Sequence, residues 1–185
     1  MTNPLPKRVL ALDPFSRGVG YAVLEGRDNL VDWGLKTTRR ADNHKASRAI
    51  ESLLEWFQSD VLAIEDWNAA DSRRCRRVEV LLDQIASVKQ KRLQVRLITR
   101  RELRMIGPQS QTNTKYGRAC LIADHFQELR PFLPRFRKPW MPEDDRMAIF
   151  DAVGFALAYL ENSAGPATDP TKKIVSRAAT QDAQE

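Results

Sequence analysis

Hydrophobic and polar positions along the chain predict a sheet built mainly from the first hundred residues. Apolar segments at 8–13, 19–25 and 30–38 are joined by short turns, and this spacing predicts an antiparallel meander of three strands. Two further strands are predicted at 61–64 and 94–99. The first and fourth of these segments contain uninterrupted apolar runs, which are typical of strands that are covered on both faces.

Apolar residues spaced three and four apart predict helices in the rest of the chain. The first follows Asp42 or Asn43, either of which can cap it, and its apolar face consists of Ala46, Ile50, Leu53, Leu54 and Phe57. Further helices are predicted at 72–90, 101–106, 114–129 and 143–160. The polar segment 109–113 and the proline-containing segment 130–142 are expected to be loops.

This order of elements predicts an α/β fold. We expect a mixed five-stranded sheet, in which a three-strand antiparallel meander is joined by two parallel strands, flanked by helices. Residues 8–161 are expected to form one domain, preceded by a flexible arm at 1–7. Residues 162–185 are rich in Ala, Ser, Thr, Asp and Gln, which predicts a disordered C-terminal tail.

The net positive charge of the protein indicates which kind of partner it binds. The 185 residues carry a formal net charge of +6, and the sequence pI is about 9.6. Both values favour a polyanionic partner, although basic clusters also occur as solvated faces. The bases form three clusters: Arg73, Arg74, Arg76 and Arg77; the Lys and Arg residues of 89–104; and Arg135, Arg137 and Lys138.

Neither a membrane segment nor a zinc site is expected. No apolar run approaches the length of a membrane span, and the first residues, MTNPLPKR, lack the apolar core of a signal peptide. We therefore expect a cytoplasmic protein. Cys75 and Cys120 are expected to be free thiols, and two cysteines with two distant histidines do not fit zinc-ligand spacing.

Two of the apolar strands end in acids. Asp13 follows the first strand and Glu65 follows the fourth. If these strands are parallel neighbours, their carboxylates emerge side by side, where they repel unless a cation lies between them. Oxygen ligands with little His or Cys nearby indicate Mg²⁺ or Mn²⁺. Asp66 is expected to be an outward neighbour of Glu65, because side chains alternate along a strand.

The last predicted helix supplies further acids. Glu143, Asp144 and Asp145 fall in its first turn, where acids also stabilise the helix dipole without any other role. Asp151 lies in an otherwise core-like stretch, where an acid is costly unless it is paired with an arginine or bound to metal. Asp144 and Asp151 are seven residues apart, so they are expected to share a helix face.

These residues resemble a known family. The stretch 13–17, Asp-Pro-Phe-Ser-Arg, followed by Gly20 and Tyr21, resembles the opening motif of RuvC-type Holliday-junction resolvases, which are RNase H-like nucleases. The stretch 63–65, Ala-Ile-Glu, resembles their second acidic motif, and Asp151 in an alanine-rich helix resembles the third. The order of elements agrees over about residues 8–160.

The resemblance implies an RNase H-like fold and a homodimer that cuts branched DNA in recombination and repair. It also implies two Mg²⁺ ions, with Mn²⁺ as a substitute, held by four acids: Asp13, Glu65, Asp151 and either Asp144 or Asp145. The family places two acids about one turn apart in the last helix, whereas this chain has Met147 and Ala148 before Asp151. Phe15 also replaces the usual glycine of the first motif.

Several residues are candidates for nucleic-acid contacts. Trp67 lies near the position of a base-stacking aromatic in the family, and a core tryptophan is the alternative. Lys115 resembles a phosphate-contacting lysine, and a surface lysine is the alternative. Further candidates are the arginines near the acidic motifs: Arg17, Arg73, Arg74, Arg76 and Arg77.

Three functions follow from these observations. The first is a metal-dependent, structure-selective endodeoxyribonuclease of the RuvC type. The second keeps the fold but acts on structured RNA, as the YqgF group does, because acids and bases directed at the backbone do not identify the sugar. The third is a nucleic-acid-binding module with a degenerate site, which the missing acid one turn before Asp151 favours.

Overall fold

A computed structural model describes residues 7–38, 42–88, 93–138 and 140–163. Its core is one five-stranded sheet in the order β3-β2-β1-β4-β5. β1 pairs antiparallel with β2 and β2 with β3, whereas β1–β4 and β4–β5 are parallel. The predicted α/β fold is therefore confirmed. The strands are β1 (Arg8–Phe15), β2 (Gly18–Glu25), β3 (Leu30–Thr37), β4 (Val61–Glu65) and β5 (Gln94–Ile98).

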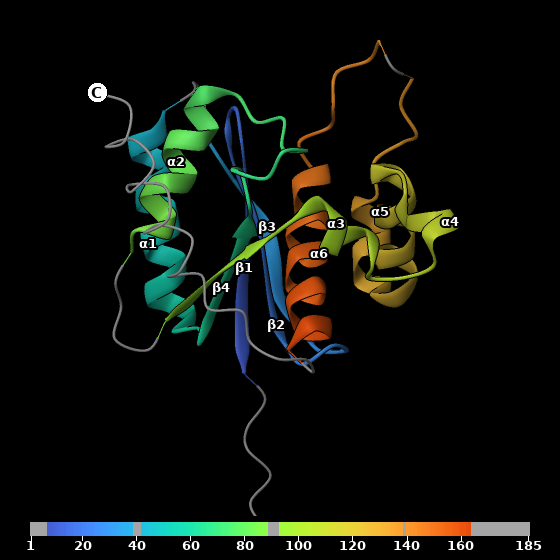
Figure 1. Cartoon of the computed structure of the whole chain (residues 1–185), viewed down its shortest axis with the longest axis horizontal. Helices are drawn as coiled ribbons and strands as arrows, with labels where there is room; N and C mark the ends of the chain where they lie inside the picture. The colour runs from blue at the N-terminus through green and yellow to red at the C-terminus, as the bar shows by residue number, and fades with distance from the viewer. Residues whose placement is uncertain (1–6, 39–41, 89–92, 139, 164–185) are drawn as a thin grey trace, which may run out of the picture.

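Helices cover both faces of the sheet (Figure 1). On one face lie α1 (Asn43–Phe57) and α2 (Arg76–Ala86). On the other, α6 (Met147–Asn162) packs on β1 and β2, with α5 (Lys115–His125) beyond it. The remaining elements are short: α3 (Arg100–Arg104), α4 (Gln109–Thr112) and the 3₁₀ helix η1 (Gln127–Phe132).

The uninterrupted apolar run of β1 reflects burial on both sides. Val9 and Ala11 pack in the core beneath α6, whereas Leu10 and Leu12 pack in the core beneath α1 and α2. α6 is buried along most of its length, which explains why its sequence is apolar nearly all round. Within the described ranges, no helix combines the length and apolar character that crossing a membrane would need.

Helix starts differ most from the sequence predictions. α2 begins at Arg76 rather than 72, after a series of turns in which Ala69 donates to the Asp66 carbonyl and Ser72 to that of Ala69. α6 begins at Met147 rather than 143, because the Asp144 carboxylate accepts a hydrogen bond from the Arg146 backbone N at 2.9 Å. Such side-chain-to-backbone bonds compete with helix formation.

The other observed boundaries differ from the predicted ones because of local interactions. β1 continues to Phe15, so Asp13 lies within the strand, opposite Gly20 of β2, rather than at its end. α5 ends at His125 instead of 129, where the extended backbone of Phe126 interrupts it. The predicted loop at 109–113 contains the short helix α4. Asp42 caps α1 by accepting from the Lys45 backbone N, which decides between the two predicted caps.

The expected arm and tail lie almost wholly outside the described residues, which begin at residue 7 and end at residue 163. They therefore stay predictions.

The contact between β2 and α6 leads to a prediction about stability. A Cβ atom on Gly20 would overlap the backbone carbonyl of Ala148. Gly20→Ala should therefore lower the free energy of unfolding by about 2–3 kcal/mol, measured by urea denaturation. Gly34→Ala is the control, because its added methyl meets only the ring of Tyr21, at 3.1 Å, which can shift. Equal losses in the two variants would contradict this account of α6 packing.

Candidate active site

Three buried carboxylates meet near the sheet. Asp13 and Glu65 are each 2% exposed, and Asp151 is 7% exposed. Asp13 and Glu65 directly follow Leu12 and Ile64, which are paired partners in the parallel strands β1 and β4. α6 crosses the same strands and brings Asp151 close enough to act electrostatically on Asp13. The structure thus gathers three of the five predicted acids.

Arg74 lies between two of these acids. Its Nη2 pairs with Asp13 Oδ1 and its Nε pairs with Glu65 Oε2. Its Nη1 also donates to the Pro14 carbonyl at 3.1 Å. Although burial lowers the pKa of Arg74, the carboxylates of Asp13 and Glu65 raise it overall, so this side chain stays charged. A guanidinium therefore occupies the position that a cation between the two acids would take.

Glu65 has two more partners. Arg100 Nε lies 3.2 Å from Glu65 Oε1, and Ser72 Oγ donates to the same oxygen at 3.3 Å. Ser72 and Arg74 both reach Glu65 from the turns that precede α2, which explains why helical structure begins only after them. Asp66 has a structural role instead. Its side chain accepts a hydrogen bond from the Asn68 backbone N and thereby stabilises these turns.

Asp151 is held by cations from α5. Lys115 Nζ lies 2.6 Å from Asp151 Oδ2 and also pairs with Glu143. Arg118 Nη2 lies 3.9 Å from Asp151 Oδ1. Burial lowers the pKa of Lys115, but the carboxylates of Asp151, Asp13 and Glu143 raise it above its ordinary value. Lys115 is thus part of the acid cluster rather than a plain surface lysine.

Asp13 is the acid whose titration is most strongly changed. Burial is the main cause that raises its pKa to about 6. Arg74 and Lys115 oppose this rise, and the negative charges of Asp151 and Glu65 add to it. The carboxyl is therefore ionised at neutral pH but takes up a proton in mildly acidic solution.

The two remaining predicted acids are engaged elsewhere. Asp144 pairs with Arg146, whose Nη2 lies 2.6 Å from Asp144 Oδ2, and this hydrogen bonding lowers the pKa of Asp144. Asp145 pairs with Arg17 at 2.7 Å. Because α6 begins after both residues, the prediction that Asp144 and Asp151 share a helix face is wrong.

The acid cluster has the ligand type of a divalent metal site but not its arrangement. Buried carboxylate oxygens are ligands that Mg²⁺ and Mn²⁺ accept, and the cationic groups of Arg74 and Lys115 already lie against these oxygens. Across the described part of the chain, however, no three acidic, His or Cys side chains converge into a ready metal cage. The donor set fits a metal, and the arrangement would have to change to hold one.

The resolvase family has two acids about one turn apart in its last helix, and in this chain close packing occupies one of the corresponding positions. The residue one turn before Asp151 is Ala148, whose backbone and Cβ lie directly against Gly20 of β2. A longer side chain at 148 would not fit between the helix and the sheet. Position 148 therefore has no room for an acid.

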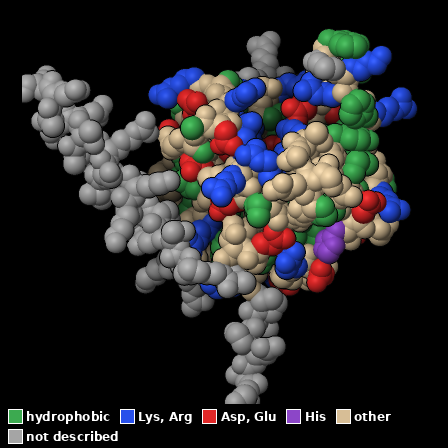
Figure 2. All heavy atoms as spheres, turned by 45° about the vertical axis from the view of Figure 1, so that its right-hand side comes forward, with side chains coloured by type: hydrophobic (Ala, Val, Ile, Leu, Met, Phe, Trp, Pro, Cys, Tyr) green, Lys and Arg blue, Asp and Glu red, His purple; other side chains and the backbone are tan. Residues whose placement is uncertain are grey.

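The other candidate residues lie around this cluster. Arg17, Arg73 and Arg76 are exposed, and Arg77 donates to the Ser16 carbonyl. Trp67 is half-buried against the core beneath α1 and α2, so the structure supports its packing role and leaves its stacking role a prediction. Figure 2 shows basic and acidic side chains side by side around a hollow in the surface.

Three contributors were missed from the sequence. Arg118 was not singled out, Arg100 was counted only as one member of a basic cluster, and Arg74 was predicted to contact nucleic acid rather than to pair with the acids. Nothing in its immediate sequence distinguishes Arg74 from Arg73, because the difference depends on the turns at 66–72. For Arg118, the available signal was its place one helical turn after Lys115.

Comparison with known proteins supports the fold. No family model and no curated protein matches this sequence. Two solved structures of Thermus thermophilus RuvC match it in fold, one of them in complex with a Holliday junction substrate. Both have a TM-score of 0.51, with 13% and 14% sequence identity, and the match covers 85% of this chain and 95% of theirs. The chain thus has a RuvC-like, RNase H-like fold.

The raised pKa of Asp13 predicts a pH dependence of stability. Folding favours the protonated carboxyl, so this contribution is fully present below about pH 4 and is lost as the pH rises through about 6. In EDTA, the wild type should lose up to about 3 kcal/mol of unfolding free energy relative to Asp13→Asn between pH 4 and 8. Denaturation at several pH values measures this difference, and Asp66→Asn, which changes a half-buried acid outside the cluster, provides the control. A difference that does not change with pH would contradict it.

Proposed function

We propose that this protein is a metal-dependent, structure-selective endonuclease that hydrolyses phosphodiesters in branched DNA. The observation that carries the proposal is the meeting of Asp13, Glu65 and Asp151, all buried, on a RuvC-like fold. The fold alone does not identify a function, but three acids buried together need cations beside them, and a metal ion can serve as such a cation. A RuvC structure in complex with a Holliday junction substrate supports the same class of DNA.

Asp13, Glu65 and Asp151 are the residues that would hold two Mg²⁺ ions, with Mn²⁺ as a substitute. Asp144 or Asp145 would complete the set, after release from Arg146 or Arg17 respectively. Bound metal lowers the pKa of a water and stabilises the charge that develops on the phosphate. This chemistry needs Asp13 in its ionised form, which is the form present at neutral pH.

The cations of the site have two tasks in this proposal. Without metal, Arg74 and Lys115 neutralise the acids and keep the buried cluster folded. For Asp13 and Glu65 to hold a metal between them, Arg74 would have to leave that position. Its guanidinium is then free beside the reacting phosphate, and guanidinium groups pair well with phosphate oxygens.

We propose that the affinity for substrate depends on the charge and shape of the nucleic-acid backbone. Exposed arginines near the acids, Arg17, Arg73 and Arg76, would contact phosphates and make the affinity depend on salt. A homodimer would place two sites for paired cuts, as the family resemblance implies. Structured RNA remains the competing substrate, because contacts of this kind do not read the sugar.

One observation favours a second function. Arginine and lysine side chains already occupy the acid cluster, and the described residues form no ready metal cage. A nucleic-acid-binding module with a degenerate site would show the same arrangement. The two experiments that follow separate it from the nuclease.

Replacing Asp13 tests the catalytic proposal. Asp13→Asn should reduce Mg²⁺-dependent cleavage of a four-way DNA junction at least 1,000-fold, roughly the effect of losing an essential transition-state contact of ~4 kcal/mol. Binding to the same junction in EDTA should change less than twofold. Cleavage is measured on gels with junctions, duplexes, R-loops and structured RNA, and Asp66→Asn is the matched control. Full cleavage by Asp13→Asn would contradict the catalytic role of Asp13. If the wild type cleaves only RNA, the substrate is structured RNA rather than branched DNA.

Replacing Arg74 tests metal binding without relying on activity. Arg74→Gln leaves two buried acids short of a cation, so the metal-free protein should lose about 3–5 kcal/mol of unfolding free energy. Mg²⁺ or Mn²⁺ should restore much of this loss and should bind the variant more tightly than the wild type in titration calorimetry. Arg76→Gln is the control, because Arg76 is exposed and makes only a 3.5 Å pair with Glu79. Destabilisation that neither metal reverses would favour the degenerate module.

A further inference from the structure

A second chemically distinctive surface lies between η1 and α6. Phe136 and Trp140 are 71% and 76% exposed, and Phe132 and Met141 are also exposed. The described residues between them include Arg135, Arg137 and Lys138. We call residues 132–138 and 140–141 the aromatic–basic segment. In Figure 2, hydrophobic and basic side chains adjoin in the same way at the upper right of the molecule.

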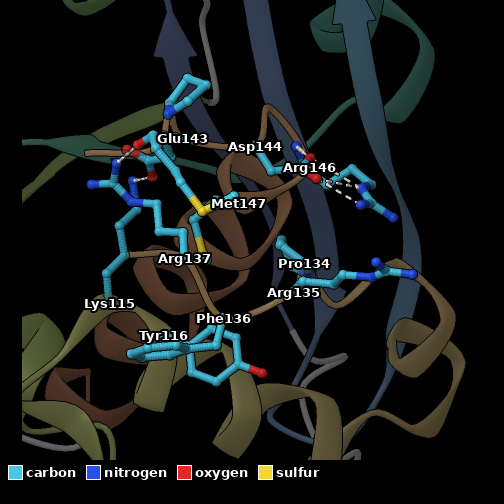
Figure 3. Close-up of a pocket in the computed structure, with 12 residues that line it drawn as sticks. Lys115, Tyr116, Pro134, Arg135, Phe136, Arg137, Glu143, Asp144, Arg146 and Met147 are labelled. Carbon is cyan, nitrogen blue, oxygen red and sulfur yellow. Dashed lines mark hydrogen bonds and ion pairs between the residues drawn. The ribbon is translucent and has the colours of Figure 1, made fainter. Parts of the chain in front are cut away.

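This segment forms one wall of a cavity of about 440 Å³ (Figure 3). The ring of Phe136 meets that of Tyr116 edge to face, with the ring centres 5.3 Å apart. Arg135, Arg137 and Arg146 also line the cavity. The cavity therefore combines aromatic faces with guanidinium groups, and its size falls in the range of pockets that hold small organic ligands.

The cavity adjoins the candidate active site through shared residues. Lys115 lines it and also pairs with Asp151 of the buried acids. Asp144, one of the two candidates for the fourth acid, lines it as well. A strand whose phosphate lies at the acid cluster would thus pass directly beside this cavity.

The composition of the surface indicates what covers it. A partner protein would favour an apolar centre with few charges, because charged residues are depleted at the centre of such interfaces. Here bases alternate with aromatics, and Lys138 Nζ lies 5.3 Å from the ring centre of Trp140. Single-stranded nucleic acids match this combination, because their unpaired bases stack on aromatic rings while their phosphates pair with Lys and Arg.

We propose that the aromatic–basic segment and its cavity bind unpaired nucleotides next to the phosphodiester that is cut. One base stacks in the cavity against Phe136 and Tyr116, a neighbouring base stacks on Trp140, and Arg135 and Arg137 hold the phosphates between them. The site is separate from Trp67, which packs against the opposite core. The role next to the cut phosphate rests on the proposed function, whereas the binding of single strands does not.

The affinity for a single-stranded 12-nucleotide DNA, measured by fluorescence anisotropy in EDTA, tests the proposal. Phe136→Leu and Trp140→Leu keep apolar area but remove the stacking ring, so each should weaken single-strand binding about tenfold. Binding of a blunt duplex should change less than twofold. Trp56→Leu is the matched control, because Trp56 is 82% exposed on α1, on the other face of the sheet.

The salt dependence of binding tests the basic residues of the aromatic–basic segment. Arg135→Gln combined with Arg137→Gln should reduce the slope of log affinity against log salt by about 1.4, as expected for two lost phosphate contacts with a single strand. An unchanged slope, or equal losses of duplex and single-strand binding in the Phe136 and Trp140 variants, would overturn the proposal.

The competing occupant is a second copy of the chain. If it covers this surface, Trp140→Leu will shift the sedimentation coefficient toward that of the monomer and leave single-strand binding unchanged, which overturns the proposal. The result is also separable from the nuclease assignment. Single-strand binding lost in Phe136→Leu, in a protein that never cleaves, would keep this site and reject the nuclease. Junction cleavage by the wild type, together with unchanged single-strand binding in Phe136→Leu, would keep the nuclease and reject this site.

Discussion

Burying three carboxylates side by side is the constraint on which the centre of this molecule depends. Asp13, Glu65 and Asp151 repel one another at distances where solvent no longer screens them, so the fold has to supply positive charge. Arg74 and Lys115 supply it from two different segments of the chain. Their positions explain local features that propensity alone does not, above all the late start of α2 and the docking of the first turn of α5 against α6.

Tight backbone packing sets the second constraint. Gly20 and Ala148 let α6 approach β2 more closely than any larger pair would permit. This approach brings Asp151 toward Asp13, and it also removes the room for an acid at position 148. The departure from the family pattern at 148 and the depth of Asp151 therefore share one physical origin.

The sequence was sufficient for much of the fold and for part of the site. The positions of apolar residues and short turns predicted all five strands, most clearly β1 and β4, whose uninterrupted apolar runs reflect burial on both faces. Asp13, Glu65 and Asp151 were found because charges stand out in apolar surroundings. Asp144 was wrongly placed on α6, since a short-range bond from its carboxylate to the Arg146 backbone stops the helix. Arg74 went unrecognised because its role depends on turns that reverse the chain between 66 and 72.

The docking of α6 on the sheet has a consequence for the order of folding. The acid cluster joins residue 13 to residue 151, so it closes only when the last described helix packs against the first strand. Contacts between such distant positions form late, because a long loop has to be ordered first. During synthesis, a chain released before residue 151 would expose one apolar face of its sheet and lack a complete acid cluster. Completion of the fold and completion of the site are thus a single event.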